Sequence, residues 1–314
     1  MVIDASSAYG TTSALPDQET VPTDNILKGP IMAEGAHPST HLPVDQEALW
    51  FLLWNTNKKA PDLVIAELAK EFSVDIIFLT EYSGCVNTLS LLVGQTVGQS
   101  YIVSSGMNKR FACLHRHPSI GLNEIYYHGR FSVRKLSLGT LPTLVCLVHG
   151  VDAMNNSLAT RMSFAQEMMA DLRRLSRENK VPSLVILGDF NLNPYDEAMN
   201  QFSVFNAMMS KGCISRGLRK VDGRQYDFFY NPMWSFLGDR NPGPPGTIYY
   251  QGKQGLYGWN MFDQVLLHHS LADRLIDIKI LDSAGTMTLK GPRGRPNRTY
   301  SDHFPLYFSM EKML

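Results

Sequence analysis

The sequence predicts an α/β protein, and three observations support this class. Several apolar runs have the length of buried strands. Segments between these runs place their apolar residues at helical spacing, which indicates helices with one buried face. Most of the apolar runs also end at, or begin with, a polar side chain suited to chemistry.

The first half of the chain alternates strand and helix patterns. The strand at 49–54 is fully apolar and ends at Asn55. A helix then starts at Pro61 and Asp62, because proline fits the first turn of a helix. Its buried stripe is formed by Val64, Ile65, Leu68 and Phe72. The elements expected next are a strand at 75–81 that ends on Glu81, a helix at 83–97, and strands near 100–104, 111–114 and 131–137.

The second half continues the same alternation. The strand at 144–148 ends at His149, and a long helix over about 158–178 follows, capped by a residue within 155–157. Residues 210–260 are less regular and rich in Gly, Pro and aromatic residues. The remaining predicted elements are strands at 184–187, at 262–267 with Asp263 near its start, and at 275–281, a basic loop at 290–298, and a last strand at 301–308 that begins with Asp302 and His303.

Composition indicates a soluble globular protein with one large domain or two. The chain has 314 residues, of which 44% are apolar and 18% charged. Basic and acidic residues both number 29, so net charge indicates no partner. Residues 1–47 hold seven of the acids and one lysine, which leaves 28 basic and 22 acidic residues for the rest. This mildly basic body fits a polyanionic substrate weakly, and proteins with neutral ligands look the same.

Residues 1–44 are rich in Ser, Thr, Pro, Gly and Ala and lack periodicity. We therefore expect a disordered tail with no catalytic role, followed by one folded domain over residues 45–314. The start of the chain lacks the pattern of a signal peptide. No apolar run reaches the roughly 18 residues of a membrane span. These features predict a cytoplasmic protein, which we expect to be a monomer.

The cysteines show no spacing typical of a disulfide framework or a metal site. Because no CxxC pair occurs, buried free thiols in a reducing compartment are expected. The lack of cysteine pairs also disfavours a structural zinc site. The four cysteines are Cys85, Cys113, Cys146 and Cys213.

The stretch 184–191, LVILGDFN, organises the prediction of function. Four apolar residues are followed by a glycine and then by Asp189 and Asn191. Residues i and i+2 of a strand point to the same side, so both side chains would aim at one point beyond the strand end. A carboxylate and an amide together suit the attack of water on a phosphate. Taken alone, the stretch is equally typical of a strand followed by an Asx turn.

Polar residues mark one end of six predicted strands. The end of one strand lies beside the start of an antiparallel neighbour, so all six positions can lie on one rim of a sheet sandwich. Each is explained alone as a solvated residue at a strand end, but six together indicate a shared site. They are Asn55, Glu81, His149, Asp189 with Asn191, Asp263, and Asp302 with His303.

The residue types at this rim limit the chemistry. Carboxylate and amide oxygens suit Mg²⁺ or Mn²⁺. Such a cation neutralises phosphate oxygens during phosphoester hydrolysis. The chain has no GxxxxGK[ST] and no GxGxxG before a helix, so nucleoside triphosphate and dinucleotide sites lack support. It also has no GxSxG motif and no cysteine in a recognisable nucleophile motif.

Six short motifs occur in the order seen in one known superfamily. They are WNTN at 54–57, TE at 80–81, VHG at 148–150, GDFN at 188–191, FDQV at 262–265 and SDHFP at 301–305. Together they resemble the endonuclease/exonuclease/phosphatase superfamily of deoxyribonucleases, repair exonucleases, inositol polyphosphate 5-phosphatases and neutral sphingomyelinases. The pair GDxN with SDH is fairly specific, and six motifs in order are highly specific. The resemblance covers residues 48–309 and implies a four-layer αββα sandwich of two mixed β-sheets with helices on the outer faces.

The resemblance also implies catalytic roles. Asp189 would orient or deprotonate the attacking water, and Asn191 would contact the phosphoryl oxygens. His303 would bond to the scissile phosphate, with Asp263 fixing its tautomer. His149 would stabilise the transition state or assist the leaving group.

For the metal, the resemblance implies Glu81 as the principal ligand of Mg²⁺ or Mn²⁺. Asn55 would lie beside it, and Asp302 would help to hold the metal or its waters. Two positions depart from the exonuclease III-like branch. Asn57 stands where that branch commonly has an aspartate, and His149 stands where it has no histidine. Both departures favour the deoxyribonuclease, phosphatase and sphingomyelinase branches.

The leading interpretation is a metal-dependent phosphodiesterase that cleaves nucleic acid. Arg293, Arg295 and Arg298 precede the SDH motif, so their loop should border the site and bind phosphates without reading sequence. Aromatic residues of the irregular region are candidates for stacking on bases. An equally good account has these rings packed at the sandwich edge and the cations solvated. The aromatic residues are Trp234, Tyr249, Tyr250, Tyr257 and Trp259.

Two further interpretations remain open. One is a phosphatase or phospholipase-like enzyme that acts on a phosphorylated small molecule or a lipid headgroup, where the same cations would bind additional phosphates. The other is a non-catalytic binding module on this scaffold. The complete set of carboxylates and histidines argues against a module, because a degenerate site usually loses some of them.

Overall fold

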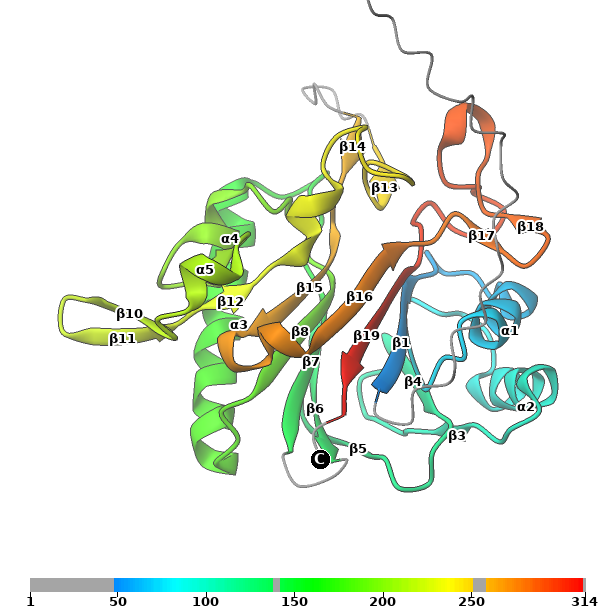
Figure 1. Ribbon diagram of the computed structural model, residues 1–314, viewed down its shortest axis with the longest axis horizontal. Helices are drawn as coiled ribbons and strands as arrows, with labels where there is room; N and C mark the ends of the chain where they lie inside the picture. The colour runs from blue at the N-terminus through cyan, green and yellow to red at the C-terminus, as the bar shows by residue number, and fades with distance from the viewer. Residues whose placement is uncertain (1–47, 138–141, 251–257, 313–314) are drawn as a thin grey trace, which may run out of the picture. The chain divides into compact units, whose positions relative to one another are not determined.

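The computed structural model describes residues 48–137, 142–250 and 258–312. Two β-sheets pack face to face, and helices cover their outer faces (Figure 1). This is the αββα sandwich that the motif resemblance implies, so the predicted fold class is confirmed. The predicted tail, residues 1–44, lies outside the described residues.

One sheet has six strands, with β1 at its centre. β1 runs antiparallel to β19 and parallel to β2. In this register Asn55 pairs with Thr80, so β1 and β2 end at the same edge. The strand order is β16 (Leu275–Ile280), β19 (Leu306–Glu311), β1 (Ala48–Asn55), β2 (Ile76–Thr80), β4 (Phe111–His115) and β3 (Ile102–Val103).

The second sheet has seven strands and brings three motifs to one edge. β7 and β8 are parallel, with His149 opposite Asp189. β15 is antiparallel to β8, with Asp263 opposite the same Asp189. The strand order is β5 (Gly121–His128), β6 (Phe131–Ser137), β7 (Thr143–His149), β8 (Leu184–Asp189), β15 (Asp263–His268), β12 (Phe229–Tyr230) and β9 (Ala207–Met208).

The side chains of β8 show why the sandwich has four layers. Val185 and Leu187 belong to the core between the two sheets. Leu184 and Ile186, which alternate with them, belong to a second core that includes apolar residues of the long helix α3. Both faces of the strand are therefore buried, and each fully buried aliphatic side chain contributes about 1.5–3 kcal/mol. This explains why the strand is a continuous apolar run rather than an alternating one.

The helices agree with the predicted pattern. α1 and α2 lie outside the six-stranded sheet, and α3 lies outside the seven-stranded sheet (Figure 1). The predicted capping of α3 is confirmed, because Ser157 Oγ accepts a hydrogen bond from Thr160 N at 3.1 Å. The helices are α1 (Asp62–Glu71), α2 (Val86–Val97), α3 (Leu158–Asn179), α4 (Glu197–Asn200) and α5 (Lys211–Ile214).

Short elements occupy the irregular region 210–260 and the connections around β15, β16 and β19. Three pairs of strands form small hairpins, and three single turns are 3₁₀-helices. The hairpin strands are β10 (Leu218–Val221) and β11 (Arg224–Asp227), β13 (Ile248–Tyr249) and β14 (Trp259–Asn260), and β17 (Ser283–Ala284) and β18 (Met287–Thr288). The 3₁₀-helices are η1 (Pro232–Phe236), η2 (His269–Arg274) and η3 (Pro292–Gly294).

The prediction of a strand at 301–308 was wrong in its first half, since β19 begins only at Leu306. Ser301 explains the difference. Its Oγ accepts from His303 N at 3.0 Å and donates to Asn55 O at 2.7 Å, which turns the backbone toward β1 instead of extending it. Pro305 then has no N–H to offer a sheet. Asp302 and His303 therefore lie in the turn before the strand.

Other predicted boundaries also need correction. β5 was not predicted, because it is an edge strand whose half-exposed polar residues hide its period. The strand predicted at 100–104 is only Ile102–Val103, and the helix predicted at 83–97 begins at Val86. These differences leave the predicted ends of β1, β2 and β7 within one residue and that of β8 within two.

All four cysteines are free thiols, as predicted. Cys113 and Cys146 are buried, but Cys85 and Cys213 are exposed, so the prediction of burial was wrong for these two. Both exposed thiols lie where short helices meet solvent, at the N-cap of α2 and within α5. Within the described ranges, no helix combines the length and apolar character needed to cross a membrane.

Candidate active site

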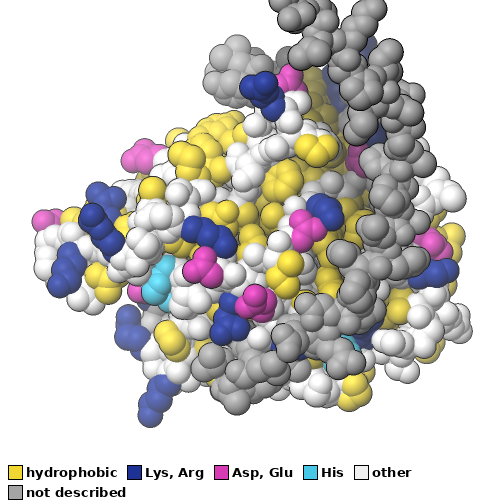
Figure 2. All heavy atoms as spheres, in the orientation of Figure 1, with side chains coloured by type: hydrophobic (Ala, Val, Ile, Leu, Met, Phe, Trp, Pro, Cys, Tyr) yellow, Lys and Arg dark blue, Asp and Glu magenta, His cyan; other side chains and the backbone are white. Residues whose placement is uncertain are grey.

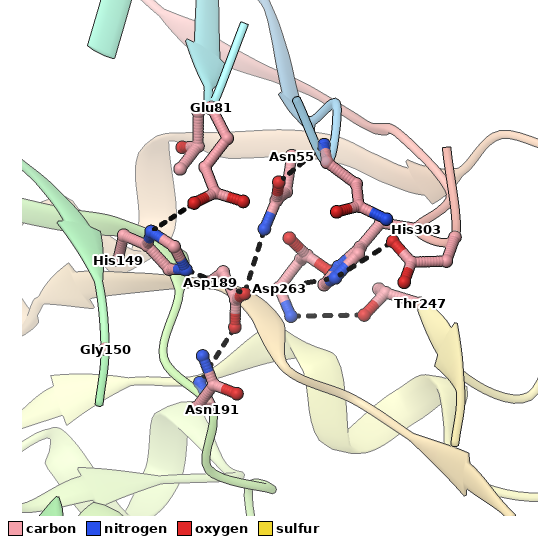
Figure 3. Close-up of polar contacts among 12 residues, drawn as sticks. Asn55, Glu81, His149, Gly150, Asp189, Asn191, Thr247, Asp263 and His303 are labelled. Carbon is pink, nitrogen blue, oxygen red and sulfur yellow. Dashed lines mark hydrogen bonds and ion pairs between the residues drawn. The ribbon is translucent and has the colours of Figure 1, made fainter. Parts of the chain in front are cut away.

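The predicted rim residues converge from both sheets on one place (Figure 3). β1, β2, β7 and β8 all end there, and β15 begins there. A side-chain hydrogen bond joins the two sheets, because Asn55 Nδ2 donates to Asp189 Oδ2 at 3.0 Å. The structure thus brings together residues that lie up to 248 positions apart, from Asn55 to His303, as the rim argument predicts.

Asp189 lies at the centre of this arrangement. Its Oδ2 faces Nε2 of His149 at 3.8 Å and Nε2 of His303 at 3.9 Å. The carboxylate is buried, and burial raises its pKa, an effect that the Asp263 charge adds to and the two histidines oppose. A carboxylate that holds a proton more readily than usual is suited to accept one from water.

The Asp189–Asn191 segment forms an Asx turn and also places both side chains at the rim, so the two interpretations of this stretch are compatible. Asn191 N donates to Asp189 Oδ1 at 2.9 Å, which is the hydrogen bond of an Asx turn. Asn191 adopts a φ of 52°, in the left-handed region that asparagine tolerates better than most residues. Arg161 of α3 donates to Asn191 O at 2.6 Å. The turn therefore holds the amide at the rim rather than replacing the site.

His303 is held by Asp263, as predicted. Its Nδ1–H donates to Asp263 Oδ2 at 2.7 Å, which leaves Nε2 on the side of Asp189. Burial alone would lower the pKa of His303. The Asp263 carboxylate, helped by Asp189 and Asp302, outweighs burial and raises this pKa to about 10. His303 is therefore an imidazolium at neutral pH, with an N–H available for a phosphoryl oxygen.

Arg110 is a residue of this site that the sequence analysis missed. Its Nη1 lies 2.8 Å from His149 Nδ1 and 3.3 Å from Glu81 Oε1. A guanidinium has no acceptor, so His149 Nδ1 must be the unprotonated nitrogen and Nε2 carries the hydrogen. Burial, together with Arg110 and Arg130, lowers the pKa of His149 against the opposing charge of Asp189. His149 is thus a neutral donor that points at Asp189.

Glu81 has an unusual backbone that aims it at the rim. Its φ is 54°, and for a residue other than glycine such a conformation costs about 1–3 kcal/mol. Two backbone hydrogen bonds maintain it: Glu81 N donates to Arg110 O at 2.9 Å, and Lys58 N donates to Glu81 O at 2.9 Å. The strain therefore coincides with the residue that the motif resemblance makes the principal metal ligand.

Two glycines explain the VHG and GDFN motifs. Gly188 has a φ of 140°, and a Cβ there would overlap Val148 O. A Cβ at Gly150 would overlap Phe190 O. Because both positions tolerate no side chain, the ends of β7 and β8 approach closely, and Gly150 N donates to Asp189 O at 2.7 Å.

The predicted metal ligands offer oxygen atoms suited to a hard cation. Asp302 Oδ1 is buried and has no hydrogen-bond partner among the described residues. It lies 3.8 Å from His303 Nε2. Beside this ion pair, a buried carboxylate oxygen that accepts no hydrogen bond is costly unless a cation meets it closely. With Glu81 and Asn55 on the other side of the rim, the donor set fits Mg²⁺ or Mn²⁺.

Of the three predicted substrate-binding arginines, the structure connects Arg295 most directly to the rim. Its guanidinium carbon lies 3.6 Å from the centre of the Tyr249 ring. Ile248, the residue before Tyr249, forms a β-bridge with His303. Arg293 and Arg298 are exposed on the same loop.

The candidate aromatic residues that the structure describes are half-buried. Tyr249 meets Trp259 edge to face with ring centres 5.4 Å apart, and Trp259 stacks on Phe304 at 6.3 Å. This row of rings runs from the sandwich core to Arg295. The contacts therefore show the packing that the sequence analysis offered as one account of these rings, and stacking on bases stays a prediction. Tyr257 lies outside the described residues.

Comparisons with solved structures agree with this fold. The human Nocturnin catalytic domain with bound sulfate has 14% identity and a TM-score of 0.50, covering 83% of this chain and 93% of that chain. An endonuclease/exonuclease/phosphatase family protein from Bacteroides thetaiotaomicron has 14% identity and a TM-score of 0.50, covering 85% and 98%. A mannosyl-6-phosphatase from the same bacterium has 15% identity and a TM-score of 0.50, covering 83% and 98%.

The chain therefore has the endonuclease/exonuclease/phosphatase fold, and the resemblance drawn from its six motifs is confirmed at the level of fold. No family model matches the sequence. No curated protein sequence matches it either. The motifs and the rim geometry thus carry the functional argument.

Proposed function

We propose that this chain is a divalent-metal-dependent phosphodiesterase that cleaves nucleic acid by the attack of an activated water. The observation that carries the proposal is the buried Asp189 carboxylate, which Asn55 holds at 3.0 Å between the Nε2 atoms of His149 and His303. A base flanked by two donors suits a reaction in which water loses a proton while phosphoryl oxygens gain charge.

A residue of the rim can be assigned to each step of this hydrolysis. Asp189 accepts a proton from water, whose oxygen attacks phosphorus while the P–O bond to the leaving alcohol breaks. His303 Nε2–H, charged because of Asp263, donates to a non-bridging oxygen. Asn191 and His149 donate to the same group or to the leaving oxygen. The leaving oxygen takes up a proton from solvent, so the products are a phosphate monoester and an alcohol.

Glu81, Asn55 and Asp302 would hold the cation, and Mg²⁺ or Mn²⁺ would neutralise part of the phosphoryl charge when bound. Asp302 Oδ1, which accepts no hydrogen bond from the described residues, supports this assignment. Arg110 maintains the arrangement beside Glu81 by keeping His149 in its Nε2–H form.

Nucleic acid is favoured as the substrate by the Arg295–Tyr249–Trp259 row. A guanidinium stacked on a ring at 3.6 Å, next to a second ring, offers one charge for a phosphate and one flat surface for a base. The alternative is a phosphatase or sphingomyelinase-like enzyme on a phosphorylated small molecule or a lipid headgroup. The similarity to a mannosyl-6-phosphatase supports keeping this alternative.

A substrate comparison tests the proposal. The purified chain, with Mg²⁺ or Mn²⁺, is assayed on supercoiled DNA, single-stranded DNA, RNA, sugar phosphates and phosphoinositides, with Asp189→Asn as the matched inactive control. We expect metal-dependent cleavage of a nucleic acid that the control lacks. Turnover of only sugar phosphates or phosphoinositides would establish the alternative. No turnover of any substrate would favour a binding module.

A further inference from the structure

A second group of metal-binding side chains lies at the far end of β15. This strand starts with Asp263 at the rim and ends with His268. Six strand residues place the two ends about 17 Å apart. At the far end, His268 and the next residue, His269, meet Asp227 at the end of β11.

The three side chains already lie close together. One possible ligand atom from each, two imidazole nitrogens and a carboxylate oxygen, falls within 4.8 Å of the other two. The histidine ring centres are 4.1 Å apart, and His268 Nε2 is 3.9 Å from Asp227 Oδ1. In the described part of the chain, no other group of three His, Cys, Asp or Glu side chains meets this distance.

The backbone around the group is well fixed. Phe229 pairs with His268 across the sheet, and His269 N donates to Phe228 O at 2.9 Å. Asn206 Nδ2 donates to Asp227 O at 3.1 Å. The residues are therefore held by the sheet, while the side chain of Asp227, which is 56% exposed, is free to rotate by the small amount that a shared ion requires.

Ser270 fixes the ring of His268. Its Nδ1 lies 2.8 Å from Ser270 Oγ and accepts from Ser270 N at 3.4 Å, so Nε2 carries the hydrogen and faces Asp227. A metal bound at Nε2 would move this hydrogen to Nδ1, where Ser270 Oγ can accept it.

We propose that Asp227, His268 and His269 bind one transition-metal ion, with Zn²⁺ the best match. Two imidazoles and one carboxylate are a donor set that zinc accepts, with ligand distances near 2.0–2.2 Å and a fourth position left for water. Asp227 lies 41 positions before His268 in the sequence. None of the three ligands is a cysteine, so a search for cysteine pairs does not find them. This site differs in place and in donor type from the oxygen-rich rim.

The ion would join two parts of the fold. Asp227 ends the β10–β11 hairpin, which extends away from the sandwich, whereas His268 ends β15 and His269 begins η2 (Figure 1). Figure 2 shows histidine surface at the base of this hairpin, open to solvent, with Lys and Arg side chains along the hairpin itself. Metal binding would therefore fix the position of a cationic hairpin relative to the sheet that carries the active site.

Zinc binding to the full chain tests the proposal. Metal-stripped protein is titrated with Zn²⁺ by calorimetry, and bound zinc is counted by elemental analysis after dialysis. We expect His269→Ala and Asp227→Asn each to bind one zinc fewer than the wild type, or to bind it at least about tenfold more weakly, since even outer partners of metal ligands contribute 10–100-fold. Asp273→Asn, on the same 3₁₀-helix, and Cys213→Ser, on the neighbouring α5, should bind as the wild type does.

Two further measurements exclude loss of folding as the explanation. Circular dichroism should be the same for all variants. At a hundredfold excess of zinc over its Kd, the melting temperature of the wild type should rise by about 5 °C more than that of His269→Ala. Zinc binding of equal number and affinity in the wild type and in both ligand variants would overturn the proposal, as would a wild type that binds no zinc.

Discussion

The two carboxylate oxygens of Asp189 have different hydrogen-bond partners. Oδ1 accepts from Asn191 N and holds the turn, whereas Oδ2 accepts from Asn55 Nδ2 and faces the histidines. An asparagine at this position can keep the turn with its single oxygen. Its amide group would then face Asn55 as one donor against another. The change is therefore local, and it removes the base without removing the fold.

Asp189→Asn and His303→Ala should each nearly abolish turnover. Loss of a general base costs about 10²–10⁴ in rate, and loss of a preorganised donor about 10²–10³. Because both groups act on one transition state, the double variant should be far less than multiplicatively worse. Metal-dependent phosphodiester hydrolysis by the four proteins measures this, with circular dichroism to check folding. Substantial activity in either folded single variant would exclude the rim as the active site.

The raised pKa of His303 predicts a pH dependence of stability. A histidine whose folded pKa of about 10 exceeds its unfolded value near 6.5 stabilises the fold fully below pH 6.5. This stabilisation is lost as pH rises from about 6.5 to about 10. In metal-free protein, the difference in unfolding free energy between wild type and His303→Gln should therefore shrink across that window. Denaturant titrations at several pH values measure it, and a constant difference would contradict the raised pKa.

Arg110 should matter for catalysis although it lies outside the motifs. Arg110→Met removes the donor that keeps His149 in its Nε2–H form and the cation beside Glu81. Partners of this kind typically contribute about 10–100-fold. We expect a fall of this size in kcat, with partial recovery in Arg110→Lys. Lys109→Met, which changes the exposed neighbour, is the control. Equal loss in the control, or none in Arg110→Met, would contradict the assignment.

At the residue scale, the sequence predicts which side chains meet but not what holds them. Asn55, Asp189 and His303 are found through strand ends and motifs. Arg110 precedes an ordinary strand, and nothing local marks it, because its partners Glu81 and His149 lie 29 and 39 positions away. Pairings of this length depend on how β2, β4 and β7 are arranged in two different sheets.

At the scale of elements, the connection that carries the SDH motif illustrates the limits of periodicity. Its three polar residues lead directly into the apolar run of β19, but Ser301 Oγ offers His303 N a nearer acceptor than a neighbouring strand does. Trp54 Nε1 then donates to His303 O at 2.9 Å. Side-chain bonds to the backbone thus decide this segment, and a pattern of apolar residues does not contain them.

The basic loop before this connection should bind substrate rather than take part in the chemical step. Replacing Arg293, Arg295 and Arg298 by alanine should raise KM with little change in kcat. On double-stranded DNA, the slope of log K against log salt should become shallower by about 2–3, since each lost phosphate contact removes about 0.9. The same triple change in the β10–β11 hairpin, at Arg219, Lys220 and Arg224, is the control for lost surface charge. An equal effect of both triples would indicate nonspecific attraction.

At the scale of the whole molecule, two sheets are needed because neither holds a complete site. The six-stranded sheet supplies Asn55 and Glu81, and the seven-stranded sheet supplies His149, Asp189 and Asp263. The apolar core between the sheets keeps these edges together. The resemblance of the six motifs implies this sandwich, and the continuous apolar runs of the buried strands agree with it, because a strand covered on both faces is apolar on both faces.

The last prediction follows from where the motifs and the core begin. Every residue of the rim and of the described core lies after position 47, and residues 1–44 are too poor in large apolar side chains to build a core of their own. Deleting residues 1–44 should therefore change the melting temperature by less than about 2 °C, the equivalent of roughly 0.5–1 kcal/mol. Hydrolysis and the monomeric mass in solution should stay unchanged. Differential scanning calorimetry, the substrate assay and light scattering on both forms measure this. A larger fall in melting temperature, or a change in mass, would show that the tail packs on the domain or joins two copies of it.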